Sequence, residues 1–233
     1  MGIEQWQAWN KSVFFLTNGS DSLYLDGVFW TVTHTATWIP LLLAVLYVIG
    51  KNNPWRKSLF VVGMMALLIL ITDQVASGLC KPYFHILRPT HDPATAPMVD
   101  IVNGYRGGLY GFFSSHAANT FAAATFLSLL FRSYRTAVVL TLFALSSTFS
   151  RLYLGVHSPL DIAVGTVFGI FAGGVIYLLY HLGERRFCAQ RDYFSSVYTS
   201  SGYLTNDLLL IDLVFALTLA YIAFRAIFLA VSF

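Results

Sequence analysis

Six long apolar segments constrain the fold of this chain more than any other feature of its sequence. A helix needs about 20 mostly apolar residues to cross the hydrocarbon core of a bilayer. The segments that reach or approach this length cover residues 27–49, 58–78, 115–131, 136–153, 160–182 and 208–231. Only 11% of the residues are charged, whereas soluble domains carry roughly a quarter. The sequence therefore predicts an all-α fold, a polytopic membrane bundle of six transmembrane helices.

The N-terminal segment, residues 1–24, is expected to lie in the membrane interface as a separate helix. It is amphipathic and carries the aromatic residues Trp6, Trp9, Phe14 and Phe15. Such a composition is typical of helices that lie flat at the surface of a bilayer. No internal repeat and no Pro/Gly linker interrupts the sequence, so residues 1–233 are expected to form a single domain.

The distribution of basic residues predicts how the spans are oriented. Lysines and arginines gather in the loops 51–57, 132–135 and 184–191, which share one side if six spans alternate. The positive-inside rule makes that side the cytoplasm. The loop 81–114 and the short connection 154–159 then face outward, which in a bacterium means the periplasmic side of the inner membrane.

Net charge and cysteine placement each exclude one property of the chain. Its formal net charge of +3 is too small to indicate binding of nucleic acid. Cys80 and Cys188 fall on opposite membrane surfaces, so no disulfide is expected between them.

Polar residues gather in three clusters, each at a point where a span meets the outer surface. The clusters cover residues 81–89, 113–116 and 150–161. If the helices bundle with their outer ends together, the three clusters converge on one site. That site would combine three permanent cations, two histidines and one carboxylate, namely Lys81, Arg88, Arg151, His116, His157 and Asp161.

These residue types suit the binding of a phosphoryl group. Arginine matches two phosphate oxygens with paired hydrogen bonds, and lysine supplies a compact charge. Lys81, Arg88 and Arg151 are therefore candidate phosphate ligands, although isolated basic residues at span ends usually act as interfacial anchors. Ser114 and Ser115 stand at the start of a predicted helix, where free backbone N–H groups and the positive end of the helix dipole favour an anion.

The third cluster predicts its own local geometry. Ser158, Pro159 and Asp161 have the order of a helix start, with an N-cap, a proline in the first turn and an acid three residues after the cap. Asp161 is expected to turn back toward His157 and to accept a hydrogen bond from one imidazole nitrogen, which leaves the other nitrogen free for attack. His157 is thus the candidate nucleophile, Asp161 its orienting group and His116 the candidate general acid.

The three clusters resemble the signature of the type 2 phosphatidic acid phosphatase (PAP2) superfamily, which shares its site with vanadium haloperoxidases. That signature reads K-x6-R-P, then P-S-G-H, then S-R-x5-H-x3-D. The matching residues here are Lys81, Arg88, Pro89, Ser114, His116, Ser150, Arg151, His157 and Asp161. The second motif departs from the family at Phe113 and Ser115, where the family has proline and glycine.

The resemblance implies a phosphatase that forms a phosphohistidine intermediate on His157, which is hydrolysed by water that His116 activates. It also implies phosphate binding by backbone amides and by Lys81, Arg88, Ser114 and Arg151. It implies no metal and no cofactor, and one carboxylate among several cations is a poor environment for Mg²⁺.

Asp73 is an ionisable residue inside an apolar span. It lies about two turns before Lys81, at a depth where an ionisable group costs roughly 2.5–3.5 kcal/mol. Two interpretations remain open for it. It either supports a catalytic cation or forms a packing contact between helices together with Gln74.

Four other residues carry open alternatives. Arg106 lies in a glycine-rich stretch and either meets a second phosphate or a sugar, or belongs to a plain turn-rich loop. His85 and His91 lie in the same outer loop and either touch substrate or do not. Arg225 in the sixth span either snorkels outward or faces the site.

The leading functional hypothesis is a lipid phosphatase whose substrate keeps its tails in the bilayer and presents its head group to water. The favoured substrates are undecaprenyl pyrophosphate and a lipid A phosphate, with phosphatidylglycerophosphate or phosphatidate as the alternative. A vanadate-dependent haloperoxidase is a second hypothesis, but those enzymes are large soluble proteins and nothing in this sequence resembles a halide pocket. A small membrane transporter is a third, and it would need charges within the spans instead of at one surface.

Overall fold

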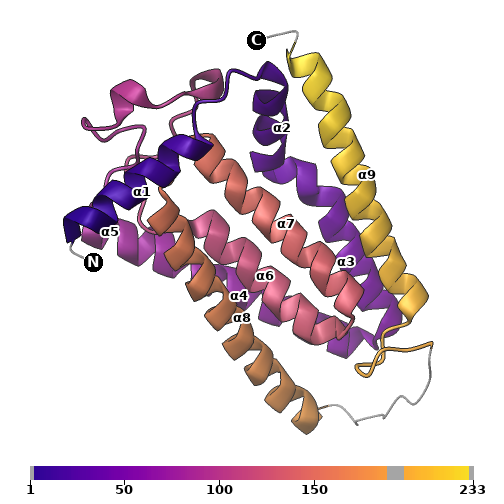
Figure 1. Ribbon diagram of the computed structural model, residues 1–233. Helices are drawn as coiled ribbons and strands as arrows, with labels where there is room; N and C mark the ends of the chain where they lie inside the picture. Colours follow the sequence, from indigo (N-terminus) through magenta and orange to yellow (C-terminus); the bar gives the residue numbers. More distant parts are fainter. Residues whose placement is uncertain (1–2, 188–196, 231–233) are drawn as a thin grey trace.

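The computed structural model describes residues 3–187 and 197–230, and within these residues it contains helices and loops but no β-strand (Figure 1). Among these residues, five helices are long and apolar enough to cross a membrane, and they cover Thr35–Asn52, Trp55–Phe84, Tyr134–Tyr153, Pro159–Glu184 and Thr205–Ala230. The remaining predicted span, the third along the chain, is helix α6, Ser115–Phe131, whose 17 residues lie at the short limit for a crossing helix. The all-α class is therefore confirmed for the described residues, while the count of six spans stays a prediction.

The first predicted span is broken. It consists of α2 (Leu23–Thr33), a 3₁₀ turn η1 (Thr35–Trp38) and α3 (Ile39–Asn52), and the backbone of His34 between them is extended. The prediction of one continuous helix over this region was therefore wrong. The break falls in a threonine-rich stretch just before Pro40, and neither threonine nor proline favours the interior of a helix.

Side chains replace the backbone hydrogen bonds that this break removes. Thr37 Oγ1 donates to Thr31 O over 2.7 Å, and Trp38 Nε1 donates to Val32 O over 2.8 Å. Irregular backbone at membrane depth is tolerated only where such partners satisfy it. The break leaves Thr33 at the end of α2, where its side chain is free to contact the site described below.

The second span ends in a π-helical segment that determines the position of Lys81. α4 (Trp55–Asp73) continues into η2 (Gln74–Cys80), whose backbone is π-helical, and then into the short α5 (Lys81–Phe84). Such π-helical turns are rare and often lie at functional sites. Here the segment leads to Lys81, whose Nζ donates a hydrogen bond to Ser115 Oγ on α6 over 3.3 Å.

Helix α6 lies at the centre of the bundle and packs closely against α8 (Pro159–Phe187) (Figure 1). α8 presents glycines at a four-residue spacing along this contact, and a Cβ at Gly169 would lie only 2.4 Å from the carbonyl oxygen of Ala118. Small residues at this spacing let two helix backbones approach each other. The starts of the two helices are joined as well, because Ser114 N donates to Asp161 O over 3.1 Å.

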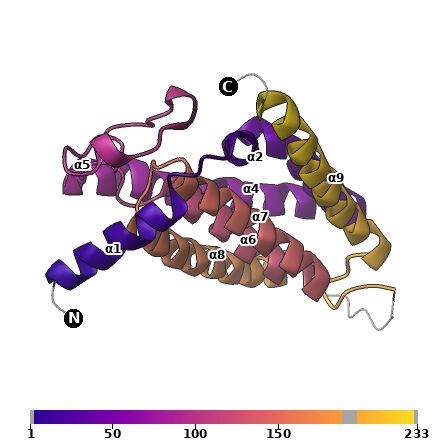
Figure 2. The same cartoon turned by 45° about the horizontal axis from the view of Figure 1, so that its top comes forward.

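The remaining helices surround this centre. α7 (Tyr134–Tyr153) lies beside α6, and α9 (Thr205–Ala230) packs against α2 and α3 at the side of the bundle (Figure 1). α1 (Ile3–Thr17) lies against α7 and α8 (Figure 2). Asn10 Oδ1 on α1 accepts a hydrogen bond from Leu160 N over 3.0 Å. The predicted N-terminal helix is thus present and attached to the bundle, while its place in the membrane interface stays a prediction.

The long loop between α5 and α6 folds back over the end of the bundle at which α6 and α8 begin. It contains two short 3₁₀ turns, η3 (Ala96–Met98) and η4 (Val102–Gly104). An antiparallel β-bridge joins Leu87 to Tyr110, so the two ends of the loop lie side by side.

Two predictions extend beyond the described residues. Cys80 forms no disulfide with any described residue, but Cys188 lies outside the described residues, so the absence of a disulfide between them stays a prediction. The basic loop 184–191 is described only as far as residue 187.

Candidate active site

The three polar clusters predicted from the sequence meet at one end of the bundle, where α6 and α8 begin and α7 ends. Arg88, Arg151, His157 and Asp161 are buried there, with 8%, 3%, 1% and 3% of their surfaces exposed. Charged side chains are almost never buried unless they are paired or bind a ligand. The burial of two arginines at one place therefore already indicates a site for an anion.

The start of α8 has the predicted capping arrangement. Ser158 Oγ accepts from Asp161 N over 3.3 Å, and Asp161 Oδ2 accepts from Ser158 N over 2.9 Å. This reciprocal pair is a capping box, and it holds the carboxylate beside the preceding His157. Asp161 Oδ2 lies 3.5 Å from His157 Nδ1, which is longer than an ordinary N–H···O hydrogen bond. Catalytic hydrogen bonds are often this long without substrate and shorten when substrate binds.

The surroundings of His157 favour its neutral form. The pKa of His157 is lowered to about 4, chiefly by burial, which together with the charges of Arg88 and Arg151 outweighs the opposing effect of Asp161. A neutral imidazole keeps the lone pair that a nucleophile needs. Because Nδ1 faces Asp161, Nε2 is the nitrogen available for attack.

Backbone carbonyls hold Arg88 in place. Its Nε donates to Tyr110 O over 3.1 Å, and its Nη1 donates to Val156 O over 3.3 Å. Gly107, with φ of +68°, leaves room for it, since a Cβ at this position would lie 2.7 Å from Arg88 Nη1. Burial lowers the pKa of Arg88, and the charge of Arg151 lowers it further, but a guanidinium keeps its proton in proteins. The glycine-rich loop thus packs onto a site cation.

Arg151 is held by two side chains that the sequence did not single out. Its Nη1 donates to Thr33 Oγ1 at the end of α2, and its Nη2 donates to Tyr105 Oη over 2.9 Å. Its guanidinium also lies 5.4 Å from the centroid of the Tyr105 ring, within the range of a cation–π interaction. Arg151 Nε is buried and has no hydrogen-bond partner among the described residues. The threonine run inside an apolar span was a usable signal for Thr33, whereas nothing in the sequence distinguished Tyr105.

Lys81 is half-buried at the edge of the site and is linked to the interior of its own span. Its Nζ donates to Ser77 Oγ over 3.1 Å and to Ser115 Oγ over 3.3 Å. Ser77 Oγ in turn donates to Asp73 Oδ1 over 3.4 Å. Asp73 therefore reaches a site cation with Ser77 as the intermediary, while its support of a catalytic cation stays a prediction.

Ser114 and His116 lie at the start of α6. Ser114 is fully buried, and its Oγ caps the helix by accepting from Ala117 N over 3.4 Å. Its hydroxyl therefore serves the helix, and the N–H groups of the first turn remain for an anion. His116 is half-buried. The titratable groups that act electrostatically on His116 are Arg151, His157, Arg88 and Lys81.

Three other candidates lie in the outer loop. Arg106 is exposed, and its Nη1 donates to Thr90 O over 3.1 Å, so it ties the loop together. His85 is exposed and contacts the ring of Tyr110, with 4.9 Å between the centroids. His91 is half-buried in the same loop. A contact between Arg106 and a second phosphate stays a prediction.

The charge balance of the site indicates what it binds. The three cations Lys81, Arg88 and Arg151 face two carboxylates, Asp161 within the site and Asp73 behind Ser77, so the charges sum to +1 before the histidines are counted. This excess of positive charge favours an anion such as a phosphate. Among residues 3–187 and 197–230, no group of three His, Cys, Asp or Glu side chains is arranged to hold a metal ion.

Comparisons with known proteins identify relatives of this chain. A family model described as the PAP2 superfamily matches residues 58–185. A lipid A 4'-phosphatase of Porphyromonas gingivalis is 35% identical over 212 residues, which cover 89% of each protein. A lipid A 4'-phosphatase of Bacteroides thetaiotaomicron is 38% identical over 165 residues, which cover 70% of this chain and 73% of the relative. No solved structure matches the chain.

Proposed function

The chain belongs to the PAP2 superfamily and is a multi-pass bacterial membrane lipid phosphatase, and from this we propose that it removes the 4'-phosphate of lipid A. Both relatives carry that activity in their names and match most of the chain. The family predicted from the sequence motifs is thereby confirmed. Undecaprenyl pyrophosphate, phosphatidylglycerophosphate and phosphatidate are the alternative substrates that the experiment below distinguishes.

The observation that supports this site is the excess positive charge around a buried, neutral histidine. His157 is 1% exposed, and burial together with Arg88 and Arg151 lowers its pKa. Two charged arginines can lie close to this imidazole because the ring is neutral and is not repelled by their charges. The cations attract the phosphate dianion, and the imidazole supplies the lone pair that attacks it.

In the proposed first step, His157 Nε2 attacks the phosphorus while the bond between phosphorus and the lipid oxygen breaks. Asp161 accepts a hydrogen bond from Nδ1–H and stabilises the positive charge that develops on the ring. His116, protonated for this step, donates its proton to the departing lipid oxygen. The dephosphorylated lipid leaves, and a phosphohistidine remains.

In the proposed second step, water attacks the phosphohistidine and the bond between phosphorus and Nε2 breaks. His116, now neutral, takes a proton from the attacking water. Inorganic phosphate is released and His157 returns to its neutral form. Throughout both steps the phosphate oxygens are bound by Lys81, Arg88, Arg151 and the backbone N–H groups at Ser114 and Ser115.

We also propose that the site faces the periplasm from the inner membrane. Basic residues gather at the opposite end of the bundle, and the positive-inside rule makes that end cytoplasmic. The test is a single cysteine at Ala94, which is exposed in the outer loop, in a background that lacks Cys80 and Cys188. A membrane-impermeant maleimide should label it in intact spheroplasts, and labelling only after lysis would reverse the orientation.

The substrate is tested with purified protein in detergent and excess chelator. Phosphate release is measured from lipid A, undecaprenyl pyrophosphate, phosphatidylglycerophosphate and phosphatidate. We expect kcat/KM for lipid A to exceed the others by at least about tenfold, a difference of about 1.4 kcal/mol in transition-state binding. A preference for another lipid would reject the lipid A assignment, and release from none of them would reject the phosphatase site.

The intermediate is tested by rapid quenching and mass spectrometry at alkaline pH. A phosphate should be found on His157 of the wild-type protein during turnover. His116→Ala should increase the amount of this species, because the hydrolysis step loses its base. Phosphate on another residue would contradict the proposed nucleophile.

A further inference from the structure

Arg225 is a permanent cation on a membrane-spanning helix, outside the candidate active site. It lies five residues before Ala230, where the described part of α9 ends, so it is about 8 Å along the helix from that end. Its Nη1 donates to Tyr221 Oη over 3.0 Å, and none of the ion pairs among the described residues includes it. An arginine at this depth is costly unless its charge is balanced.

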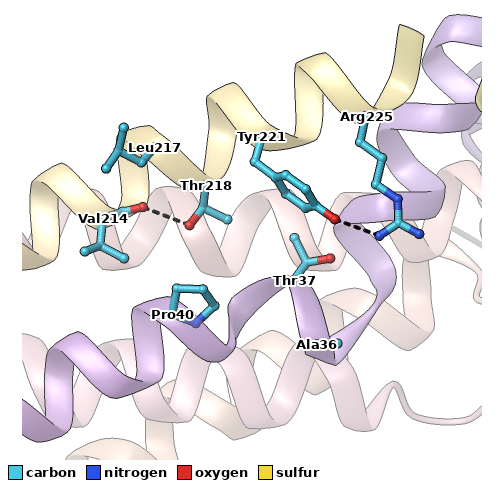
Figure 3. Close-up of a pocket in the computed structure, with 8 residues that line it drawn as sticks. All are labelled: Ala36, Thr37, Pro40, Val214, Leu217, Thr218, Tyr221 and Arg225. Carbon is cyan, nitrogen blue, oxygen red and sulfur yellow. Dashed lines mark hydrogen bonds between the residues drawn. The ribbon is translucent and has the colours of Figure 1, made fainter. Parts of the chain in front are cut away.

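Arg225 lines a groove beside the broken first span (Figure 3). The groove has a volume of about 470 Å³ and lies between α9 and the residues Ala36, Thr37 and Pro40 of η1 and α3. From α9 it is further lined by Val214, Leu217, Thr218 and Tyr221. Figure 3 shows the guanidinium and the phenol hydroxyl together at one end, with Val214, Leu217 and Pro40 toward the other.

The polar end of the groove belongs to the same membrane leaflet as the candidate active site. Gly27 of α2 packs against Ala226, next to Arg225, where a Cβ on Gly27 would lie 2.9 Å from Ala226 O. The preceding residue, Asp26, accepts a hydrogen bond from Tyr153 Oη over 2.6 Å. Tyr153 is the last residue of α7, at the edge of the site. Arg225 and the site therefore lie toward the same surface.

We propose that this groove binds one phosphate-bearing lipid of that leaflet, with its phosphate on Arg225 and Tyr221 and one acyl chain along the apolar lining. A guanidinium pairs with phosphate oxygens through two N–H groups, and a tyrosine hydroxyl donates to the same group. Anionic head groups attract arginines at the membrane surface. The lipid bound here is a ligand and is not hydrolysed, since the groove contains neither of the candidate catalytic histidines.

The test titrates the delipidated full-length protein with phosphatidylglycerol, a phosphodiester, and counts bound lipids by native mass spectrometry. We expect one tight site. Arg225→Gln should weaken binding by about tenfold, the effect of losing one charge-assisted interaction. Ala36→Phe, which fills an exposed position of the groove without changing its charge, should weaken binding to a similar extent.

The matched control is Arg132→Gln. Arg132 Nη2 donates to Tyr177 Oη over 3.2 Å, so this variant removes the same kind of arginine–tyrosine pair from another part of the bundle, and binding should be unchanged. Diacylglycerol and glycerol 3-phosphate, which carry the chains alone and the phosphate alone, should not compete. Thermal unfolding is followed for every variant.

Three results would overturn the proposal. The first is wild-type affinity in Arg225→Gln or in Ala36→Phe when both are folded. The second is an equal loss in Arg132→Gln, which would mean general attraction to basic residues. The third is a dimer that survives delipidation and dissociates in Arg225→Gln, which would assign the groove to a second copy of the chain.

Discussion

The two ends of the bundle differ in whether their cations are paired with carboxylates. At the end that carries the basic loops, three cations are each matched with a carboxylate of their own, in the pairs Lys51–Asp207, Lys57–Glu184 and Arg135–Asp212. At the site end, Arg88 and Arg151 share Asp161, whose Oδ2 is already engaged by Ser158 N, and Lys81 reaches Asp73 only through Ser77. Paired charges join helices to one another, whereas buried cations without a partner of their own retain their attraction for a ligand.

The largest effect on turnover is expected for His157→Ala, a change confined to the site end. Loss of the nucleophile should lower phosphate release by at least about 10⁴-fold, as it does in enzymes with a covalent intermediate. Single-turnover phosphate release measures it, with His91→Ala in the outer loop as the control. A residual rate within about tenfold of wild type would show that another group attacks the phosphorus.

Arg151→Gln tests most directly whether a buried cation without a carboxylate of its own serves ligand binding and not stability. Its guanidinium is a proposed phosphate ligand, so kcat/KM should fall by about 10²–10³-fold, as for the loss of one preorganised donor. The thermal midpoint should not fall with it, because removal of a buried cation that lacks a carboxylate of its own relieves a desolvation cost. Steady-state kinetics and thermal unfolding give the two values, and a large loss of stability would contradict the distinction between the ends.

Tyr105→Phe tests a positioning residue of the site end. The variant loses the hydroxyl that accepts from Arg151 Nη2 but keeps the aromatic ring. We expect kcat/KM and the affinity for orthovanadate, an inhibitor that mimics the phosphate in its transition state, to fall together by about tenfold. This is the usual effect of one hydrogen bond to a charged group. Tyr110→Phe is the matched control, since Tyr110 serves Arg88 through its backbone carbonyl. A fall in stability alone would assign Tyr105 a merely structural part.

The cations of the site end should also keep His157 neutral. Its pKa is lowered to about 4, so the ring should remain neutral when the pH falls from 7.5 to 5.5. The depressed value means that its contribution to stability is complete above pH 6.5 and is lost as the pH falls toward 4. The ¹⁵N chemical shift of the ring, followed as a function of pH, measures the pKa of His157, and the signal is assigned by its loss in His157→Gln. A titration midpoint near pH 6.5 would contradict the lowered pKa.

The smallest effect on activity is expected at the paired end. Lys57→Gln removes the partner of Glu184 and should lower the thermal midpoint by about 2–4 °C, corresponding to about 1 kcal/mol for a partly exposed pair. kcat/KM should stay at the wild-type value. A loss of activity without a loss of stability would show that the paired charges also serve the site.

Local patterns predicted the parts of the site that depend on neighbours in the chain. The capping box at Ser158 and Asp161 follows from the order of residues around Pro159, because it involves a single helix turn. The link from Asp73 toward Lys81 follows from positions on one helix. Thr33 and Tyr105, which hold Arg151, come from segments distant in the sequence, and no local rule connects them.

The course of the first span shows the same limit in the fold. Hydropathy marked an apolar segment long enough to cross a membrane, and it was interpreted as one helix. The structure breaks it at His34, because Thr37 and Trp38 bind the carbonyls that the break releases. Hydropathy measures how apolar a segment is and contains no information about such side-chain partners.

The sequence by itself determined the helical membrane class, the three motifs and the chemical types of the groups that meet around His157. Composition and short-range spacing are sufficient for these properties because they depend on transfer free energies and on single helix turns. Only the tertiary structure decided which cations lack a carboxylate of their own, how Arg151 is held and where Arg225 lies. Those properties depend on the distances between helices, which close packing of small residues such as Gly169 against Ala118 sets.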